Sequence, residues 1–251
     1  MTDIVTALLA VVFAFEGYLL GSVNAGVLVS KVFYRDDVRN HGSGNAGTTN
    51  MLRTFGKKAA ALTLVIDFFK GTLACALPCI IIYAAAADHH AGLICMMTAA
   101  CGCVAGHNWP CYFGFKGGKG VLVSFSVMLF LAPLPALLAL AAFIVTVAIS
   151  RYVSLGSVIA AAVYPALVFF IGGWPENTKG LTTFFIVSIC LASLLIIRHA
   201  SNISRLAKGT ESKLSFSKKA SANENTDENG GEKEPEKASS SEQSDAPREN
   251  D

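Results

Sequence analysis

Long apolar runs separated by short polar segments fill most of the chain before residue 214. The runs cover residues 4–30, 59–87, 91–106, 119–133, 135–150, 153–172 and 180–197. A helix needs ~20 predominantly apolar residues, within a range of roughly 17–25, to cross a bilayer. The first, second, sixth and seventh runs meet this requirement, and the other three are shorter. The pattern predicts an all-α, polytopic membrane helix bundle with about seven transmembrane helices.

Two prolines, Pro133 and Pro135, interrupt an otherwise continuous apolar stretch over residues 119–150. Proline removes a backbone donor and breaks or kinks a helix. We therefore predict a proline-containing turn between two short spans. One long kinked helix is the alternative, and it would invert the orientation of everything that follows.

The distribution of basic residues decides between these two topologies. Seven spans with the N-terminus outside place thirteen Lys and Arg residues in inner segments and only Lys179 in an outer one. Cytoplasmic loops carry an excess of Lys and Arg. A single helix over 119–150 would instead place Arg151 and the basic segment after residue 198 outside. The predicted orientation is therefore N-terminus outside and C-terminus cytoplasmic, with four polar segments on the inner face.

Composition divides the chain into two domains. The sequence is 53% hydrophobic and 15% charged, whereas soluble domains average about 25% charged residues. Residues 215–251 hold five Lys/Arg and ten Asp/Glu, whereas residues 1–214 hold fifteen and eight. We predict a membrane domain over 1–213 and a disordered acidic cytoplasmic tail over 214–251, because so polar a segment cannot bury a core.

Neither a metal site nor a disulfide is expected from the cysteines. Most of the seven lie in apolar runs, where a thiol behaves as a small hydrophobic group. Cys101 and Cys103 lack the two-residue gap typical of zinc ligands. We expect no cofactor and no nucleic-acid partner. The N-terminus, which opens with Asp3, does not have the pattern of a signal peptide.

The first polar segment, 35–58, has the residues of a phosphate-binding loop. Glycines alternate there with polar side chains in the stretch GSGNAGTTNMLR. Successive backbone N–H groups in such turns form a concave anion site, and an arginine can bind phosphate through two parallel hydrogen bonds. The candidate residues are Gly42, Ser43, Gly44, Asn45, Thr49, Asn50 and Arg53. The GxGxxG match in this stretch lacks the βαβ context of a dinucleotide site, and a flexible linker is the non-functional alternative.

The second polar segment reads GHNWPCYFGFKGGKG over residues 106–120. It differs from a P-loop in its glycine spacing and in having Gly120 after the lysine. A lysine in a glycine turn that opens a helix still favours anion binding. Lys119 is the main candidate, with Gly117 and Gly118 beside it; His107 and Asn108 are further candidates. An interfacial anchor is the alternative for Lys119, and a structural role is the alternative for His107.

The third and fourth polar segments place pairs of polar residues three positions apart. Ser154 and Ser157 have this spacing in RYVSLGS, as do His199 and Asn202 in RHASNISRLAKG. Residues three apart share a helix face, so each pair is expected to face one cavity. Packing through small residues and binding to lipid headgroups are the respective alternatives.

Together the four segments closely resemble the bacterial membrane glycerol-3-phosphate acyltransferases that use acyl phosphate, the PlsY family. The resemblance covers about residues 10–213, with the motifs in the family's order, and Thr48 replaces the alanine usual there. It implies a seven-helix fold in the bacterial inner membrane with its active site facing the cytoplasm. It also implies acyl transfer from acyl phosphate to the 1-hydroxyl of sn-glycerol 3-phosphate, the first step of phospholipid synthesis. An upstream enzyme that forms acyl phosphate is the implied partner.

The resemblance assigns Ser43, Thr49, Arg53, Lys119, Ser157, His199 and Asn202 as polar site residues. In our hypothesis Lys119 and the turn from Ser43 to Thr49 hold phosphate and stabilise developing charge. Arg53, His199 and Asn202 then position glycerol 3-phosphate. The base is either the donor's own phosphate, as is thought for the family, or His199.

Two other functions fit the sequence less well. Soluble-site acyltransferases that use acyl-CoA or acyl carrier protein have an HxxxxD motif, which this sequence lacks. An organophosphate membrane transporter is the alternative from another class. Transporters tend to show internal repeats and ionisable groups near the bilayer midplane. No repeat is evident here, and Glu16 and Asn24 are the main polar residues within the predicted spans.

Overall fold

The computed structural model describes residues 2–85, 88–171 and 178–214. Within these ranges every regular element is helical, which confirms the all-α prediction. The α-helices are α1 (Asp3–Ser22), α2 (Ala25–Tyr34), α3 (Thr48–Pro78), α4 (His89–Asn108), α5 (Val121–Leu131), α6 (Pro133–Ser150), α7 (Val153–Ile171), α8 (Thr178–Arg198) and α9 (Ala200–Ala207). Short helical turns are η1 (Val38–Asn40), η2 (Cys79–Ala85) and η3 (Cys111–Phe113). The first compact unit ends at Leu214, so it includes the first residue of the tail predicted over 214–251; the rest of that tail lies outside the described residues.

The described helices fit a membrane protein. Five segments are long and apolar enough to cross a bilayer, and α8 with α9, bent by 56°, forms a sixth candidate. The helix α5 has only 11 residues, which span about 16 Å at 1.5 Å per residue. The number of crossings and the orientation of the termini stay predictions from the sequence.

The first apolar run and the middle apolar run are each broken into two helices. The run at 4–30 is two helices, because α1 ends at Ser22 and the side chain of Asn24 caps α2 by accepting the N–H of Val27. Near the prolines, α5 ends at Leu131 and α6 begins at Pro133. The residue between them, Ala132, has the non-helical angles φ −147° and ψ 84°. The structure thus has a break at the predicted proline turn rather than one continuous helix.

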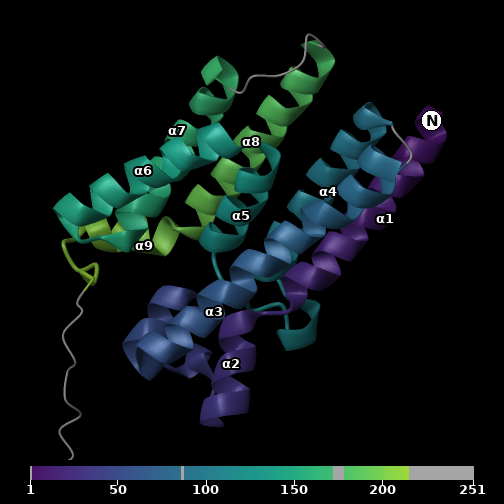
Figure 1. The fold of residues 1–251 in the computed structure, drawn as a ribbon. Coiled ribbons are helices and arrows are strands. Elements are labelled where there is room, and N and C mark those ends of the chain that lie inside the picture. Colours follow the sequence, from purple (N-terminus) through teal and green to yellow (C-terminus); the bar gives the residue numbers. More distant parts are fainter. Residues whose placement is uncertain (1, 86–87, 172–177, 215–251) are drawn as a thin grey trace, which may run out of the picture. The chain divides into compact units, whose positions relative to one another are not determined.

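Helices α1 and α4 lie side by side through glycines (Figure 1). Gly17 and Gly21 on α1 face the backbone of α4, and Gly102 and Gly106 on α4 face the backbone of α1. A methyl group on any of the four would overlap a carbonyl oxygen of the neighbouring helix. Such small residues at four-residue spacing let membrane helices approach closely. This contact fixes the end of α4, which leads into the second polar segment.

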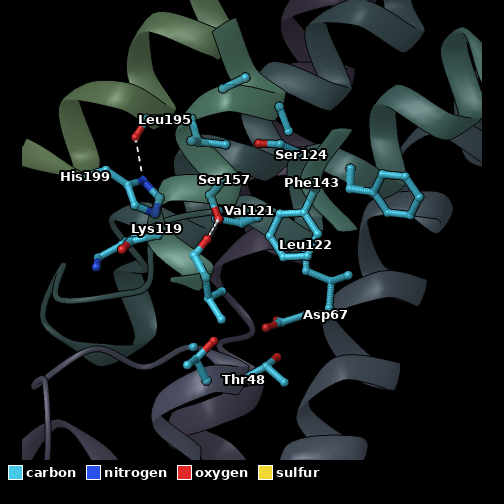
Figure 2. A pocket seen from close by; sticks show the side chains of 18 of the residues that line it. Thr48, Asp67, Lys119, Val121, Leu122, Ser124, Phe143, Ser157, Leu195 and His199 are labelled. Carbon is cyan, nitrogen blue, oxygen red and sulfur yellow. Dashed lines mark hydrogen bonds between the residues drawn. The ribbon is translucent and has the colours of Figure 1, made fainter. Parts of the chain in front are cut away.

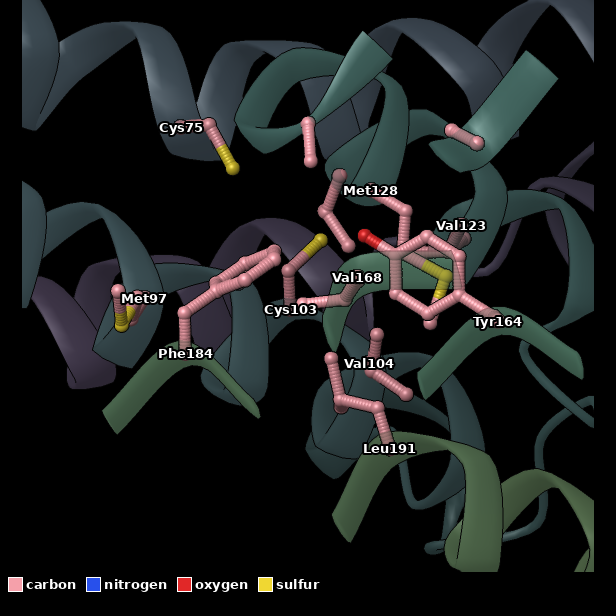
Figure 3. Packing of buried hydrophobic residues seen from close by; sticks show 14 of the residues in the cluster. Cys75, Met97, Cys103, Val104, Val123, Met128, Tyr164, Val168, Phe184 and Leu191 are labelled. Carbon is pink, nitrogen blue, oxygen red and sulfur yellow. The ribbon is translucent and has the colours of Figure 1, made fainter. Parts of the chain in front are cut away.

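The largest buried apolar cluster joins α3, α4, α5, α6, α7 and α8. Figure 3 shows Tyr164 of α7 beside Val123 and Met128 of α5. Phe184 and Leu191 extend the cluster along α8. This packing holds α5 and α7, whose ends carry Lys119 and the Ser154–Ser157 pair, close to α8.

Candidate functional site

The site is a cavity of about 570 Å³ with a mixed lining. Polar and charged side chains from all four predicted segments contribute to it, and Figure 2 shows Lys119, Ser157 and His199 close together at what we call the polar end. Apolar side chains of α3, α5, α6, α7 and α8 form much of the rest, with Leu122 and Phe143 visible in the same view. The apolar lining comprises Leu64, Phe68, Val121, Leu122, Phe125, Met128, Ala136, Ala139, Leu140, Phe143, Val153, Ala160, Ala161, Tyr164 and Leu195.

The first polar segment is a tight loop followed by a helix start that the sequence did not predict. Helix α3 already begins at Thr48, inside the segment expected to be a loop, and it has a kink at Gly56, whose angles are φ 84° and ψ −172°. The buried side chain of Asn50 organises the loop: its Oδ1 accepts the N–H of Ser43 at 3.0 Å. Its Nδ2 donates to the carbonyls of Val38 and His41 at 3.1 and 3.0 Å. The loop therefore presents Ser43 and the α3 N-terminus, a favourable environment for an anion, to the cavity.

Arg39 links the first polar segment to the second. Its Nη1 donates to the carbonyls of Phe113 and Lys116 at 2.8 and 3.1 Å. Its Nη2 lies 2.7 Å from Oδ2 of Asp37. This hydrogen bond from Arg39 lowers the pKa of Asp37 to about 2, so the pair is ionised at neutral pH. Through these hydrogen bonds Arg39 holds the first polar segment against the second.

Residues 109–120, which we call the Lys119 loop, end at the start of α5. Gly120 caps α5 with φ +76°, in the left-handed region that favours glycine. Arg198 of α8 donates to the carbonyl of Gly118 at 2.8 Å and lies over the Trp109 ring. The prediction of a lysine in a glycine turn that opens a helix is confirmed.

A hydrogen-bonded network connects Lys119 to the segment after α9. Lys119 Nζ donates to Oδ1 of Asn202, and Nδ2 of Asn202 donates to Oε1 of Glu211 at 2.6 Å. Ser154 Oγ also donates to Oε1 of Glu211, at 2.8 Å, and Arg205 Nε to Oε2, at 2.7 Å. These three hydrogen bonds outweigh the effect of burial and lower the pKa of Glu211. Glu211 is thus a carboxylate that fixes the amide of Asn202.

Two site residues have lowered pKa values. Burial, reinforced by the nearby Arg205, Arg198 and Arg53, lowers the pKa of Lys119 to about 8, although Glu211 opposes the shift. Burial also lowers the pKa of His199. The Nδ1 of His199 lies 2.8 Å from the carbonyl of Leu195, so Nδ1 carries the proton and donates (Figure 2). The neutral ring then has its Nε2 lone pair available as an acceptor.

The structure brings most of the sequence-predicted residues to the cavity. Its lining includes Ser43, Asn45, Thr49, Arg53, His107, Lys119, Ser157, His199 and Asn202. The lining does not include Gly42, Gly44, Asn50, Asn108, Gly117 and Gly118, which shape the two loops. Ser154 and Ser157 both face the cavity, as do His199 and Asn202, in agreement with their three-residue spacing.

Sequence reasoning missed two carboxylates of this site. Glu211 lines the cavity from a segment whose other charges are basic, and Asp67 lines it from within an apolar helix. The signal for Asp67 was its position three residues before Lys70 in a predicted span, because ionisable residues inside membranes are usually functional. Glu211 is harder to recognise from the sequence, because a single glutamate after a basic segment is usually a surface residue without a specific role.

Fold and cavity together define a polytopic membrane protein with an amphipathic binding site. The family model described as glycerol-3-phosphate acyltransferase matches residues 11–209. A glycerol-3-phosphate acyltransferase of Clostridioides difficile is 41% identical over 81% of this chain and 95% of its own length. One from Trichlorobacter lovleyi is 46% identical over 78% and 93%. The chain belongs to the glycerol-3-phosphate acyltransferase family, which favours the acyltransferase interpretation over the transporter.

Two solved structures are similar to the described fold. One is PlsY (YgiH), an integral membrane glycerol 3-phosphate acyltransferase in its glycerol 3-phosphate form, with a TM-score of 0.71 and 32% identity. It matches over 82% of this chain and 96% of that chain. The lysophosphatidic acid form has a TM-score of 0.69 and 30% identity, over 82% and 95%. These likenesses confirm the predicted resemblance to the PlsY family.

Proposed function

We propose that the protein transfers a fatty acyl group from acyl phosphate to the 1-hydroxyl of sn-glycerol 3-phosphate. The products are lysophosphatidic acid and inorganic phosphate, and the reaction begins phospholipid synthesis at the cytoplasmic face of a bacterial inner membrane. The observation that carries the proposal is one cavity that is lined both by the cationic side chains of Arg53 and Lys119 and by a large set of apolar side chains. This combination suits substrates that join a phosphate to an acyl chain.

The proposed step needs no enzyme nucleophile, because acyl phosphate is already activated. The glycerol hydroxyl attacks the acyl carbonyl carbon, a new ester C–O bond forms and the acyl–phosphate C–O bond breaks. The hydroxyl proton passes to the departing phosphate, or first to Nε2 of neutral His199. Lys119 and the loop around Ser43 face the charge that develops on phosphate and carbonyl oxygens. Arg53, His199 and Asn202 orient glycerol 3-phosphate.

The donor is tested with the purified full-length protein and labelled glycerol 3-phosphate. Palmitoyl phosphate, palmitoyl-CoA and palmitoyl-acyl carrier protein are offered in separate reactions, and lipid products are separated. We expect labelled lysophosphatidic acid with palmitoyl phosphate alone, and none when unphosphorylated glycerol replaces the acceptor. Product formation from either thioester at a comparable rate would show that the donor assignment is wrong.

The pH profile should report the ionisation of Lys119. Since its pKa is about 8, the ammonium form dominates below that pH and is lost above it. We expect kcat/KM for glycerol 3-phosphate to fall as pH rises through about 8, because this parameter reports the free enzyme. Lys119→Arg, which stays charged, should lower overall activity but remove this alkaline decline. An unchanged decline in Lys119→Arg would assign it to another group.

A further inference from the structure

Three ionisable side chains lie buried together where α1, α3 and α4 meet. Lys70 Nζ lies 2.7 Å from Asp67 Oδ1, and His107 Nδ1 lies 3.5 Å from the same oxygen. Their side chains are between 2% and 6% exposed. We call Asp67, Lys70 and His107 the Asp67 cluster. Asp67 and His107 line the cavity, whereas Lys70 does not.

The ammonium group of Lys70 connects the cluster to the end of α1. Nζ donates to the carbonyls of Gly21 and Val23 at 3.1 and 2.9 Å. Nζ also lies 3.0 Å from His107 Nδ1. The last carbonyls of a helix have no partner within the helix. Lys70 therefore supplies hydrogen bonds to the carbonyls at the end of α1, where the chain turns into α2. One side chain of α3 therefore fixes both the helix break and the ring of His107.

His107 connects the cluster to the Lys119 loop. Its carbonyl accepts the N–H of Gly118 at 3.1 Å. Its ring packs against Gly118 so closely that a methyl group there would overlap Nε2. The next residue along the chain is Lys119, whose ammonium lies in the polar end of the cavity. The position of the imidazole therefore limits where the backbone next to Lys119 can lie.

Stability alone does not account for this arrangement. A buried ion pair is expensive to desolvate, and replacing one with apolar residues is often neutral or stabilising. The glycine contact between α1 and α4 already holds these helices together. We propose that Asp67, Lys70 and His107 are positioning residues, which act through Gly118 to hold Lys119 in place for acyl transfer. The inference rests on the proposed function, in which Lys119 binds phosphate.

The decisive variant neutralises the pair without leaving an isolated charge. Asp67→Asn alone and Lys70→Met alone should both lower the melting temperature, because each leaves one buried charge uncompensated. The double variant Asp67→Asn/Lys70→Met should recover much of the lost melting temperature, although the carbonyls of Gly21 and Val23 still lack their donor. Its kcat/KM should nevertheless stay roughly 10–100-fold low, the size of effect that small misplacements of catalytic groups produce. Its Kd for glycerol 3-phosphate, measured by calorimetry, should rise several-fold.

The matched control is Glu16→Gln on α1. Both carboxylate oxygens of Glu16 are also buried, but Glu16 does not line the cavity. This variant should keep wild-type Kd and kcat/KM. If the double variant regains both stability and wild-type substrate parameters, the cluster is structural only and the inference is overturned.

A second variant decides the question if the double variant does not fold. Lys70→Arg keeps the charge opposite Asp67, but a planar guanidinium cannot place one nitrogen beside Asp67, His107 and two backbone carbonyls as the ammonium does. We expect a folded protein whose kcat/KM is lowered about 10-fold, because Lys119 would be slightly misplaced. Wild-type activity in this variant would overturn the inference. The calorimetric Kd keeps this test separate from the donor assignment, since a wild type that binds glycerol 3-phosphate but ignores acyl phosphate fails only the proposed function.

Discussion

Lys119→Ala is expected to lower kcat/KM for acyl transfer by roughly 10²–10³-fold, the usual cost of removing one donor that stabilises developing negative charge. Lys119 brings a partly buried positive charge to the polar end of the cavity, where its Nζ donates to Asn202. At a partly buried position the attraction between this ammonium and phosphate is stronger than at a fully exposed surface. Turnover of palmitoyl phosphate by the purified variant measures the loss.

Lys116→Ala is the matched control for this prediction. Lys116 lies in the same loop, but it is exposed and does not line the cavity. Its backbone carbonyl, which accepts from Arg39, is unchanged by the substitution. Lys116→Ala should therefore retain near-wild-type turnover. Equal losses in the two variants would mean that general charge near the membrane matters, and not the position of Lys119.

The helical fold was predictable because a bilayer leaves few choices. Backbone groups in lipid must be satisfied within a helix, so long apolar runs predict helices without knowledge of their neighbours. The break at Val23 and Asn24 was not predictable in this way. Besides the local Asn24 cap, it is stabilised by Lys70, which donates to the carbonyls of Gly21 and Val23 from 49 and 47 residues away. Local hydropathy contains no information about such a partner.

The candidate site was predictable where function follows from local chemistry. A lysine between glycines and a His–Asn pair at helical spacing can each be recognised from a few neighbouring residues. Lys119, His199 and Asn202 all line the cavity. Asn50 was predicted to bind substrate, yet its described hydrogen bonds go to the backbone of its own loop. Asp67 and Glu211 acquire their roles only through contacts with other helices. Single-sequence reasoning therefore finds the loops but not the carboxylates that hold them.

Glu211→Ala is expected to destabilise the described membrane unit and to abolish acyl transfer. The Glu211 side chain is 7% exposed, and its removal leaves Ser154 Oγ and Asn202 Nδ2 without their acceptor. A buried donor that loses its partner costs about 1–3 kcal/mol. The Arg205 guanidinium adds less, because it is 39% exposed and water screens it. Thermal unfolding of the purified variant should show a clear decrease in melting temperature.

Glu211→Gln separates the structural contribution of Glu211 from its effect on the site. The glutamine carbonyl can still accept from Ser154 and Asn202, while its amide nitrogen faces Arg205 unfavourably. The melting temperature should therefore lie between those of wild type and Glu211→Ala. Lys213→Ala, at an exposed neighbouring position, should match the wild type in both assays. Wild-type stability and turnover in Glu211→Ala would contradict the prediction. A folded Glu211→Gln protein with a raised KM for glycerol 3-phosphate would instead show that Glu211 acts by orienting Asn202, whose amide oxygen accepts from Lys119.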